Sequence, residues 1–124
     1  MDGQYDTILM LMNGIGIVGT LDRMTVFFRL LNKILSEKGQ VLCDSSDISY
    51  IFEDENGIIK YPDNDRYYGE VSFQMKYKNT VGEPFNWLYI DSNTLQRVAE
   101  ENGFYVEVIA EGKHYDYLAR ITKQ

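Results

Sequence analysis

Cysteine is nearly absent from this chain of 124 residues, in which Cys43 is the single example. No disulfide can form within the chain, which is typical of proteins that fold in a reducing compartment. Cys43 lies in the apolar run QVLC, so we interpret it as a small buried side chain and not as a reactive thiol. These features predict a cytoplasmic protein whose stability comes from packing alone.

Basic residues are also scarce. The chain has 12 Lys and Arg residues against 19 Asp and Glu residues, which gives a formal net charge of -7. Since contacts to phosphate groups depend on Lys and Arg, this balance argues against nucleic acid or an anionic membrane surface as a partner. No group of Cys and His residues has the spacing of metal ligands, so no metal site is predicted.

Long apolar runs and a secretory leader are missing as well. No stretch approaches the ~18 consecutive apolar residues that a membrane helix needs. Residues 1–4 are polar and no basic leader precedes the next apolar run, so no signal peptide is expected. With 44% hydrophobic and 25% charged residues, the composition is that of an ordinary globular protein. The length predicts a single domain over residues 1–124.

The first part of the chain predicts a strand, a helix and a second strand. Ile8 to Met12 form a continuous apolar run, typical of a strand that is covered on both faces. The glycines of NGIGIVG (residues 13–19) end this strand. Thr20 is the expected N-cap of a helix that continues to a stop at Gly39. QVLCD (residues 40–44) is the second strand, and the three elements form a right-handed βαβ unit.

Residues 48–90 show no helical period and predict an antiparallel β insertion. Asn56-Gly57, within YIFEDENGIIKY, is a strong signal for a tight hairpin turn. Further on, GEVSFQMKYK alternates apolar and polar residues, and FNWLYI follows it. These two runs are expected to pair antiparallel around a loop at residues 79–84.

The last part of the chain predicts a helix and a terminal hairpin. Asp91 or Ser92 is the expected N-cap of the helix, and Gly103 is its expected end. FYVEVIA and YDYLARIT both alternate as strands, and the short turn between them predicts an antiparallel hairpin.

The order of these elements resembles the C-terminal half of a class I S-adenosylmethionine (SAM)-dependent methyltransferase. YDTILMLMNGIGIVG is similar to the fourth strand of that family with its loop, and GQVLCDSSD to the fifth strand. FNWLYIDSNTLQRVAEENGFYVEVI is similar to a helix and the sixth strand, and GKHYDYLARIT to the seventh strand. The resemblance implies an α/β fold: a partial doubly wound, Rossmann-like sheet with two parallel strands, a C-terminal antiparallel hairpin and an antiparallel β insertion.

The resemblance implies a cofactor and also a gap in its site. In the family, SAM is held mainly by a first strand with a glycine-rich turn and by an acidic residue that ends the second strand. Neither feature precedes Tyr5. The chain is therefore expected to be a fragment of an enzyme that methylates an unidentified acceptor. On its own it is expected to bind SAM weakly or not at all and to be inactive.

Two polar loops supply candidate site residues, because ligands of open α/β sheets bind beyond the carboxyl ends of the strands. By resemblance, Asn13, Gly14 and Gly16 border the SAM pocket. A purely structural turn is another interpretation of this loop, and an independent phosphate loop is a third.

The loop after the second strand is the candidate for the acceptor side. Its polar residues are Asp44, Ser45, Ser46 and Asp47. The alternative interpretation is a capped turn, which such side chains form readily by bonding to the nearby backbone.

Aromatic residues and one histidine complete the candidates. Trp87 and Tyr89, together with Tyr67 and Tyr68, are candidates for lining an acceptor pocket, with ordinary hairpin packing as the alternative. His114 has the chemistry of a general base. It lies in GKHYDY, which we expect to be a hairpin end far from the two parallel strands, so a structural role is preferred.

The strand at residues 6–12 raises the question of a partner. In the resembled family it lies inside the sheet, whereas here one side of it has no predicted neighbour, and Asp6 is the only charge near it. Either a second copy of the chain forms a homodimer with a continuous sheet, or a missing N-terminal half pairs with this strand. The alternative function is accordingly a non-catalytic domain that self-associates through this strand.

Overall fold

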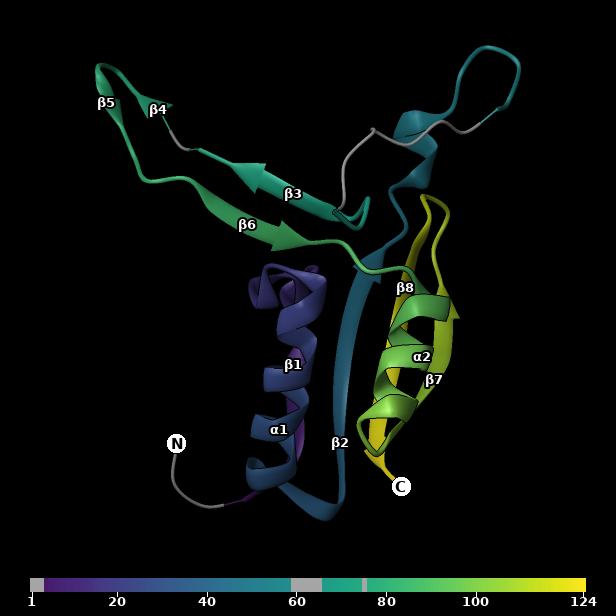
Figure 1. Ribbon diagram of the computed structural model, residues 1–124. Coiled ribbons are helices and arrows are strands. Elements are labelled where there is room, and N and C mark those ends of the chain that lie inside the picture. Colours follow the sequence, from purple (N-terminus) through teal and green to yellow (C-terminus); the bar gives the residue numbers. More distant parts are fainter. Residues whose placement is uncertain (1–3, 59–65, 75) are drawn as a thin grey trace.

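A computed structural model describes residues 4–58, 66–74 and 76–124. Its main sheet has four strands in the order β1-β2-β8-β7 (Figure 1). β1 is parallel to β2, whereas β8 is antiparallel to both β2 and β7. The strands are β1 (Tyr5–Met10), β2 (Leu35–Ser46), β7 (Phe104–Glu111) and β8 (Asp116–Lys123). The predicted fold class, with two parallel strands and a terminal antiparallel hairpin, is confirmed.

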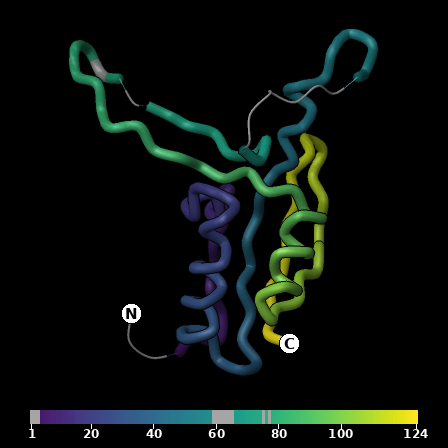
Figure 2. The backbone as a smooth tube through the Cα atoms, viewed as in Figure 1, coloured from purple at the N-terminus to yellow at the C-terminus, as the bar shows by residue number. Residues whose placement is uncertain are grey.

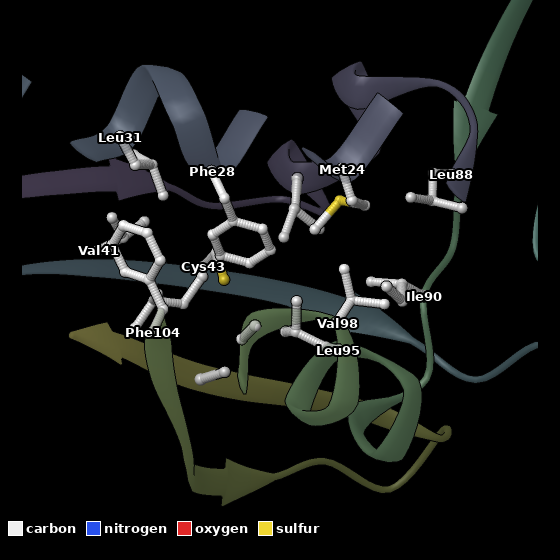
Figure 3. Close-up of a cluster of buried hydrophobic side chains, with 14 of the residues drawn as sticks. Met24, Phe28, Leu31, Val41, Cys43, Leu88, Ile90, Leu95, Val98 and Phe104 are labelled. Carbon is white, nitrogen blue, oxygen red and sulfur yellow. The ribbon is translucent and has the colours of Figure 1, made fainter. Parts of the chain in front are cut away.

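Two helices, α1 (Met24–Ile34) and α2 (Ser92–Glu101), pack on one face of this sheet. Phe28 and Leu31 from α1 join Leu95 and Ala99 from α2 in a single buried cluster over β2 (Figure 3). The cluster also takes Cys43 from β2, which confirms the predicted buried thiol. In the described part of the chain, no helix is long and apolar enough to cross a membrane.

Alternation along β2 and β8 separates the two faces of the sheet. In β2, Val41, Cys43 and Ser45 are buried beneath the helices, while the residues between them are half-buried. β8 repeats the pattern, with Tyr117, Ala119 and Ile121 buried. Because successive strand residues point to opposite faces, each central strand has one covered side and one side that the two helices leave open.

The first helix differs from its prediction at both ends. Thr20 makes no capping hydrogen bond, and a short 3-10 turn, η2 (Leu21–Arg23), precedes α1. The helix ends at Ile34, not at Gly39, because Leu35 turns to an extended backbone (φ -90°, ψ 131°) and enters β2. Leu35 is fully buried and pairs with Tyr5 of β1. Strand pairing and core burial thus outweigh a helical spacing that continues through this residue.

The first strand is also shifted from its predicted position. β1 spans Tyr5–Met10, whereas the sequence predicts Ile8 to Met12. Met12 has a left-handed backbone (φ 60°) and is 90% exposed, so the apolar run leaves the sheet before it ends. Hydrophobicity alone does not mark this boundary, since the run continues unbroken through it.

The C-terminal predictions are confirmed. Asp91 caps α2 by accepting a hydrogen bond from the backbone N–H of Thr94 at 3.1 Å. Gly103 ends the helix with a left-handed backbone (φ 84°). β7 and β8 form the predicted hairpin, and residues 112–115 make its turn.

Residues 70–74 and 76–88 belong to an extended hairpin, here called the arm, that projects from the body of the molecule (Figures 1 and 2). Its two predicted strands do pair antiparallel, as β3 (Glu70–Phe73) with β6 (Phe85–Leu88). The short strands β4 (Lys76–Tyr77) and β5 (Thr80–Val81) continue toward the tip. The predicted loop at 79–84 is wrong. The chain reverses at residues 78–79, where Lys78 has a left-handed backbone (φ 53°).

The Asn56-Gly57 signal gives a turn, across which the backbone N–H of Asp54 donates to the carbonyl of Ile58 at 2.8 Å. Gly57 (φ 78°) donates its N–H to the carbonyl of Asp54 at 3.1 Å, and the Asp54 carboxylate accepts bonds from Asn56 and Ile58. A 3-10 helix, η3 (Ser49–Phe52), stands where the first strand is predicted. The second predicted strand falls on residues 59–65, which lie outside the described residues.

Candidate functional site

The carboxyl ends of β1 and β2 are joined by hydrogen bonds between predicted site residues. The backbone N–H of Asn13 donates to Oδ1 of Asp44 at 2.8 Å. The hydroxyl of Ser46 donates to the side-chain oxygen of Asn13 at 3.2 Å. Asn13 has a left-handed backbone (φ 59°), a conformation that asparagine tolerates better than most residues. Three of the predicted residues therefore form one small polar network.

The glycine loop forms a 3-10 turn, η1 (Gly14–Val18), against the arm. At Gly16, a Cβ atom would come within 1.9 Å of Nε1 of Trp87. At Gly14, it would meet Cβ of Met10 at 3.4 Å, an ordinary contact. The packing of the arm therefore explains the glycine at position 16 without invoking a bound phosphate. Trp87, a predicted pocket residue, does lie beside the predicted loop.

Two adjacent tyrosines anchor the base of the arm to the end of β2 and to the start of α2. The hydroxyl of Tyr68 donates to Oδ1 of Asp47 at 2.7 Å, and that of Tyr67 donates to Oδ1 of Asp91. Burial, and then these bonds to the aspartates, raise the pKa of both tyrosines. Asp47 therefore lies in the region of the candidate site, but in the described structure it serves to hold the arm in place.

Asp91 is held in its charged form by its neighbours. Burial acts to raise its pKa, but hydrogen bonds from Thr94 and Tyr67 outweigh that effect and lower the pKa below the ordinary value. The carboxylate therefore links the arm to the start of α2, through Tyr67 on one side and the Thr94 backbone on the other.

The side chains of Ser45 and Cys43 are buried in the protein and have structural roles. The hydroxyl of the buried Ser45 accepts a bond from the backbone N–H of Ile90 at 3.0 Å. Burial, followed by the charge of Asp44, raises the pKa of Cys43 to about 12. Since the thiolate is the nucleophilic form, this thiol is inert at neutral pH.

Tyr89 lies at the base of the arm and does not join the polar network. Its backbone N–H donates to the carbonyl of Gly69 at 2.8 Å, where a Cβ on residue 69 would come within 1.8 Å of the Tyr89 carbonyl oxygen. The half-buried side chain has no hydrogen-bond partner among residues 4–58, 66–74 and 76–124. In the described structure, this candidate contributes its backbone to the base of the arm.

His114 lies nearer the candidate site than predicted. Because β8 runs antiparallel to β2, the β7–β8 turn sits at the carboxyl end of β2, and Asp47 donates its backbone N–H to the carbonyl of Tyr115 at 2.9 Å. The expectation of a distant hairpin end is wrong for this reason. The His114 side chain is exposed, and its backbone N–H bonds Asp116 at 3.2 Å. Tyr115 stacks on Tyr50 with ring centroids 4.7 Å apart.

A cavity between η1 and the arm was not predicted from the sequence. Its volume is about 540 Å³. Arg23 brings a cation to it, and Trp87 and Phe85 bring aromatic rings. The wall is completed by Ile17, Val18, Gly19, Thr20 and Asn86. Only the paired arm places Phe85 opposite a loop far away in the sequence. No metal-binding cluster occurs in the part of the chain that the structure describes.

Solved structures identify the fold. A crystal structure of a SAM-dependent methyltransferase from Bacteroides fragilis, in complex with S-adenosyl-L-homocysteine (SAH), matches with a TM-score of 0.90 and 53% sequence identity. The match covers 99% of this chain and 49% of that one. This chain has the fold of half a SAM-dependent methyltransferase. The resemblance seen in the sequence is thereby confirmed. Neither the protein-family models nor the curated proteins include a match.

More distant structures support the methyltransferase fold. The DhpI–SAH complex matches with a TM-score of 0.64 and 14% identity, over 99% of this chain and 49% of that chain. A SAM-dependent methyltransferase from Clostridium acetobutylicum matches with a TM-score of 0.61 and 10% identity, over 99% of this chain and 60% of that chain. The chain thus spans about half to three-fifths of the length of these methyltransferases.

Proposed function

We propose that this chain is the C-terminal half of a SAM-dependent methyltransferase, and that it borders the SAM site and supplies the acceptor side of the active site. The observation that carries the proposal is the 53% identity to the Bacteroides fragilis enzyme over nearly the whole chain. The network of Asn13, Asp44 and Ser46 lies beyond the carboxyl ends of two parallel strands. That is where open α/β sheets bind their ligands.

The polar network suits the border of a SAM site and not a complete site. Asn13 and Asp44 bond to each other, and Ser46 bonds to Asn13, so their hydrogen-bonding capacity is partly used within the chain. Oδ2 of Asp44 has no partner within the described part of the chain and remains available to a ligand. When bound, SAM would supply an activated methyl group to the acceptor, with SAH left as the product. The isolated chain is therefore expected to bind SAM weakly or not at all.

The chain's own residues are suited to position the acceptor. Trp87 and Phe85 offer apolar surface beside η1, and Arg23 offers a positive charge at the same cavity. Methyl transfer depends mainly on holding the two reactants in line. A loop packed against Trp87 and an arm anchored by Tyr67 and Tyr68 meet that need.

Titration calorimetry with SAH tests this function. The isolated chain is expected to give no measurable heat of binding at micromolar concentration. A chimera that places the unmatched half of the Bacteroides fragilis enzyme ahead of this chain is expected to bind SAH, and Asp44→Ala in the chimera to weaken binding. The matched control is Glu53→Ala, because Glu53 is exposed and lies outside the network. Tight binding by the isolated chain, or none by the chimera, would contradict the proposal.

A second candidate is a non-catalytic domain that forms a homodimer through residues 6–12. The outer edge of β1, where Leu9 is 61% exposed, favours self-association. Calorimetry separates the two candidate functions, because a non-catalytic domain binds no SAH, either as the isolated chain or in the chimera.

For both candidates we propose a cytoplasmic location, which the single buried cysteine supports.

A further inference from the structure

A single cation lines the cavity between η1 and the arm. The chain has 19 acidic residues against 12 basic ones, yet among the described residues of this wall Arg23 alone is charged. Within residues 4–58, 66–74 and 76–124, the Arg23 side chain has no ion pair and no hydrogen bond. The described structure therefore leaves its guanidinium free to bind an anion from outside the chain.

The acidic residues around η2 line a different cavity. That second cavity is lined by charged side chains of both signs: Asp22, Arg66, Glu70, Arg97 and Glu101. Two ion pairs, with distances of 3.3 Å and 3.6 Å, neutralise four of these five charges. No carboxylate belongs to the described wall around Arg23. An anion bound there meets no like charge from that wall.

The turn that carries Arg23 is fixed to the arm. The backbone N–H of Leu21, the first residue of η2, donates to Oε1 of Glu70 at 2.7 Å, and Glu70 begins β3 of the arm. Arg23 ends η2, and its backbone N–H donates to the carbonyl of Thr20 at 3.2 Å. On the other side of the cavity, β6 of the arm passes beside η1 (Figure 1). The cation and the aromatic rings of the arm are thus set in place before a ligand binds, which lowers the cost of binding.

Neutral polar groups and aromatic rings complete the wall. In the part of the chain that the structure describes, neither the Thr20 hydroxyl nor the Asn86 amide has a hydrogen-bond partner. Both groups are hydrogen-bond donors that suit the oxygen of an anion. Phe85 is 43% exposed and Trp87 is half-buried, so both rings present apolar surface to the cavity.

The size of the cavity suits a small organic molecule. Its volume of about 540 Å³ lies within the range of roughly 300–1,000 Å³ that is typical of small-molecule sites. An adjoining hollow of about 380 Å³ shares Ile17, Val18 and Arg23 with it and adds Val26 and Phe27. Arg23 therefore lies where two largely apolar hollows meet, and a ligand with one anionic group on an apolar body matches this arrangement.

The charge of the cavity favours a carboxylate over a phosphate. A carboxylate has one negative charge, which a single guanidinium balances through two parallel hydrogen bonds. A phosphate monoester carries a charge of about -1.5 to -2 at neutral pH. With Arg23 as the one cation in the described wall, a phosphate would keep part of its charge uncompensated.

We propose that the methyl acceptor is a small aromatic molecule with a carboxylate, which Arg23 binds while Trp87 and Phe85 contact the ring. This assignment rests on the proposed function, since it places the acceptor beside the loop that borders the SAM site. Trp87 connects the two regions, because its indole lies against Gly16 of that loop. Arg23 determines specificity in this assignment and takes no part in moving the methyl group.

Fluorescence of Trp87 tests the assignment in this chain, because the only tryptophan lines the cavity. The probe is 3-phenylpropionate, and its uncharged match is 3-phenylpropionamide. The acid is expected to change the fluorescence saturably, and the amide to bind at least about tenfold more weakly, because hydrogen bonds between charged groups are the stronger ones. Equal affinities for the acid and the amide, or no binding of the acid at millimolar concentration, would overturn the proposal. Tighter binding of benzyl phosphate than of the acid would also overturn it.

Substitution of Arg23 locates the carboxylate. Arg23→Gln is expected to weaken binding of the acid at least about tenfold and to leave the affinity for the amide unchanged. Arg29→Gln is the matched control, because Arg29 is exposed on α1 and is not part of the cavity wall. Equal affinities of the two variants for the acid, or a loss of acid and amide binding alike in Arg23→Gln, would overturn the role of Arg23.

The chimera with the Bacteroides fragilis half separates this inference from the proposed function, and it takes the place of this chain if the chain alone is insoluble. A chimera that binds SAH but has equal affinity for the acid and the amide would overturn this inference alone. A chimera that prefers the acid but fails to bind SAH would leave the carboxylate site standing and count against the proposed function.

Discussion

The indole of Trp87 lies against the backbone of Gly16, so closely that a Cβ at position 16 would come within 1.9 Å of Nε1. This contact joins the loop after β1 to the arm, two parts of the chain about seventy residues apart. It explains why a loop with the look of a phosphate-binding motif needs glycine at this position: the glycine makes room for an aromatic ring of the same chain.

Gly16→Ala is expected to destabilise the protein by about 1–3 kcal/mol, because the indole must move or the loop must shift to admit the methyl group. Urea unfolding followed by tryptophan fluorescence measures the change, since Trp87 is the only tryptophan. Gly14→Ala is the control, because its Cβ would make an ordinary contact at 3.4 Å. Equal stabilities of the two variants would show that the arm does not rest on the loop.

Tyr67→Phe is expected to lower the free energy of unfolding by about 1–3 kcal/mol, since it removes the hydroxyl between the carboxylate and the backbone N–H of Asp91. Thermal or urea unfolding measures this loss. The corresponding control, Tyr105→Phe, removes a hydroxyl from a side chain that is 57% exposed and should leave stability unchanged. Equal changes in the free energy of unfolding for the two variants would contradict the anchoring role of Tyr67.

Asp91 should make stability depend on pH in the acid range. Its folded-state pKa is below the ordinary value of 3.8. Its charged form therefore stabilises the folded state above about pH 4, and this contribution disappears as the pH falls through the folded-state pKa. The difference in unfolding free energy between the wild type and Asp91→Asn should be constant near neutral pH and shrink in acid. A difference that stays the same at every pH would count against this linkage.

Cys43 should react slowly with thiol reagents while the protein is folded. Its pKa is raised to about 12 by burial and by Asp44, and the side chain is only 1% exposed. A disulfide reagent that absorbs on reaction should report little modification of native protein at pH 8 and complete modification in urea. Rapid modification of the native protein would show that the core over β2 opens readily.

Much of the fold follows from local patterns in the sequence. Alternation in FYVEVIA and YDYLARIT predicts the hairpin of β7 and β8, since one face of that hairpin is buried against the helices. Asp91 and Gly103 mark the ends of α2 because capping chemistry is local. Asn13, Asp44 and Ser46 are predicted as site residues because they follow the carboxyl ends of the two parallel strands, and the structure joins them by hydrogen bonds.

Other features could not be predicted because they depend on contacts between distant parts of the chain. Helical spacing continues through Leu35, but pairing with Tyr5 makes this residue part of a strand. The sequence predicts that His114 lies in a distant turn, yet the antiparallel direction of β8 brings that turn to the end of β2. The cavity beside Arg23 exists only because the arm folds back over η1.

The sequence by itself determined the order of the main-sheet strands and the two helices, the caps of α2 and the methyltransferase resemblance, since these depend on residue type and spacing along the chain. Only the tertiary structure decided which side chains meet, because packing selects among local conformations of similar energy. The contact of Gly16 with Trp87, the bond of Tyr67 to Asp91 and the cavity that Arg23 and Phe85 line all belong to that second class.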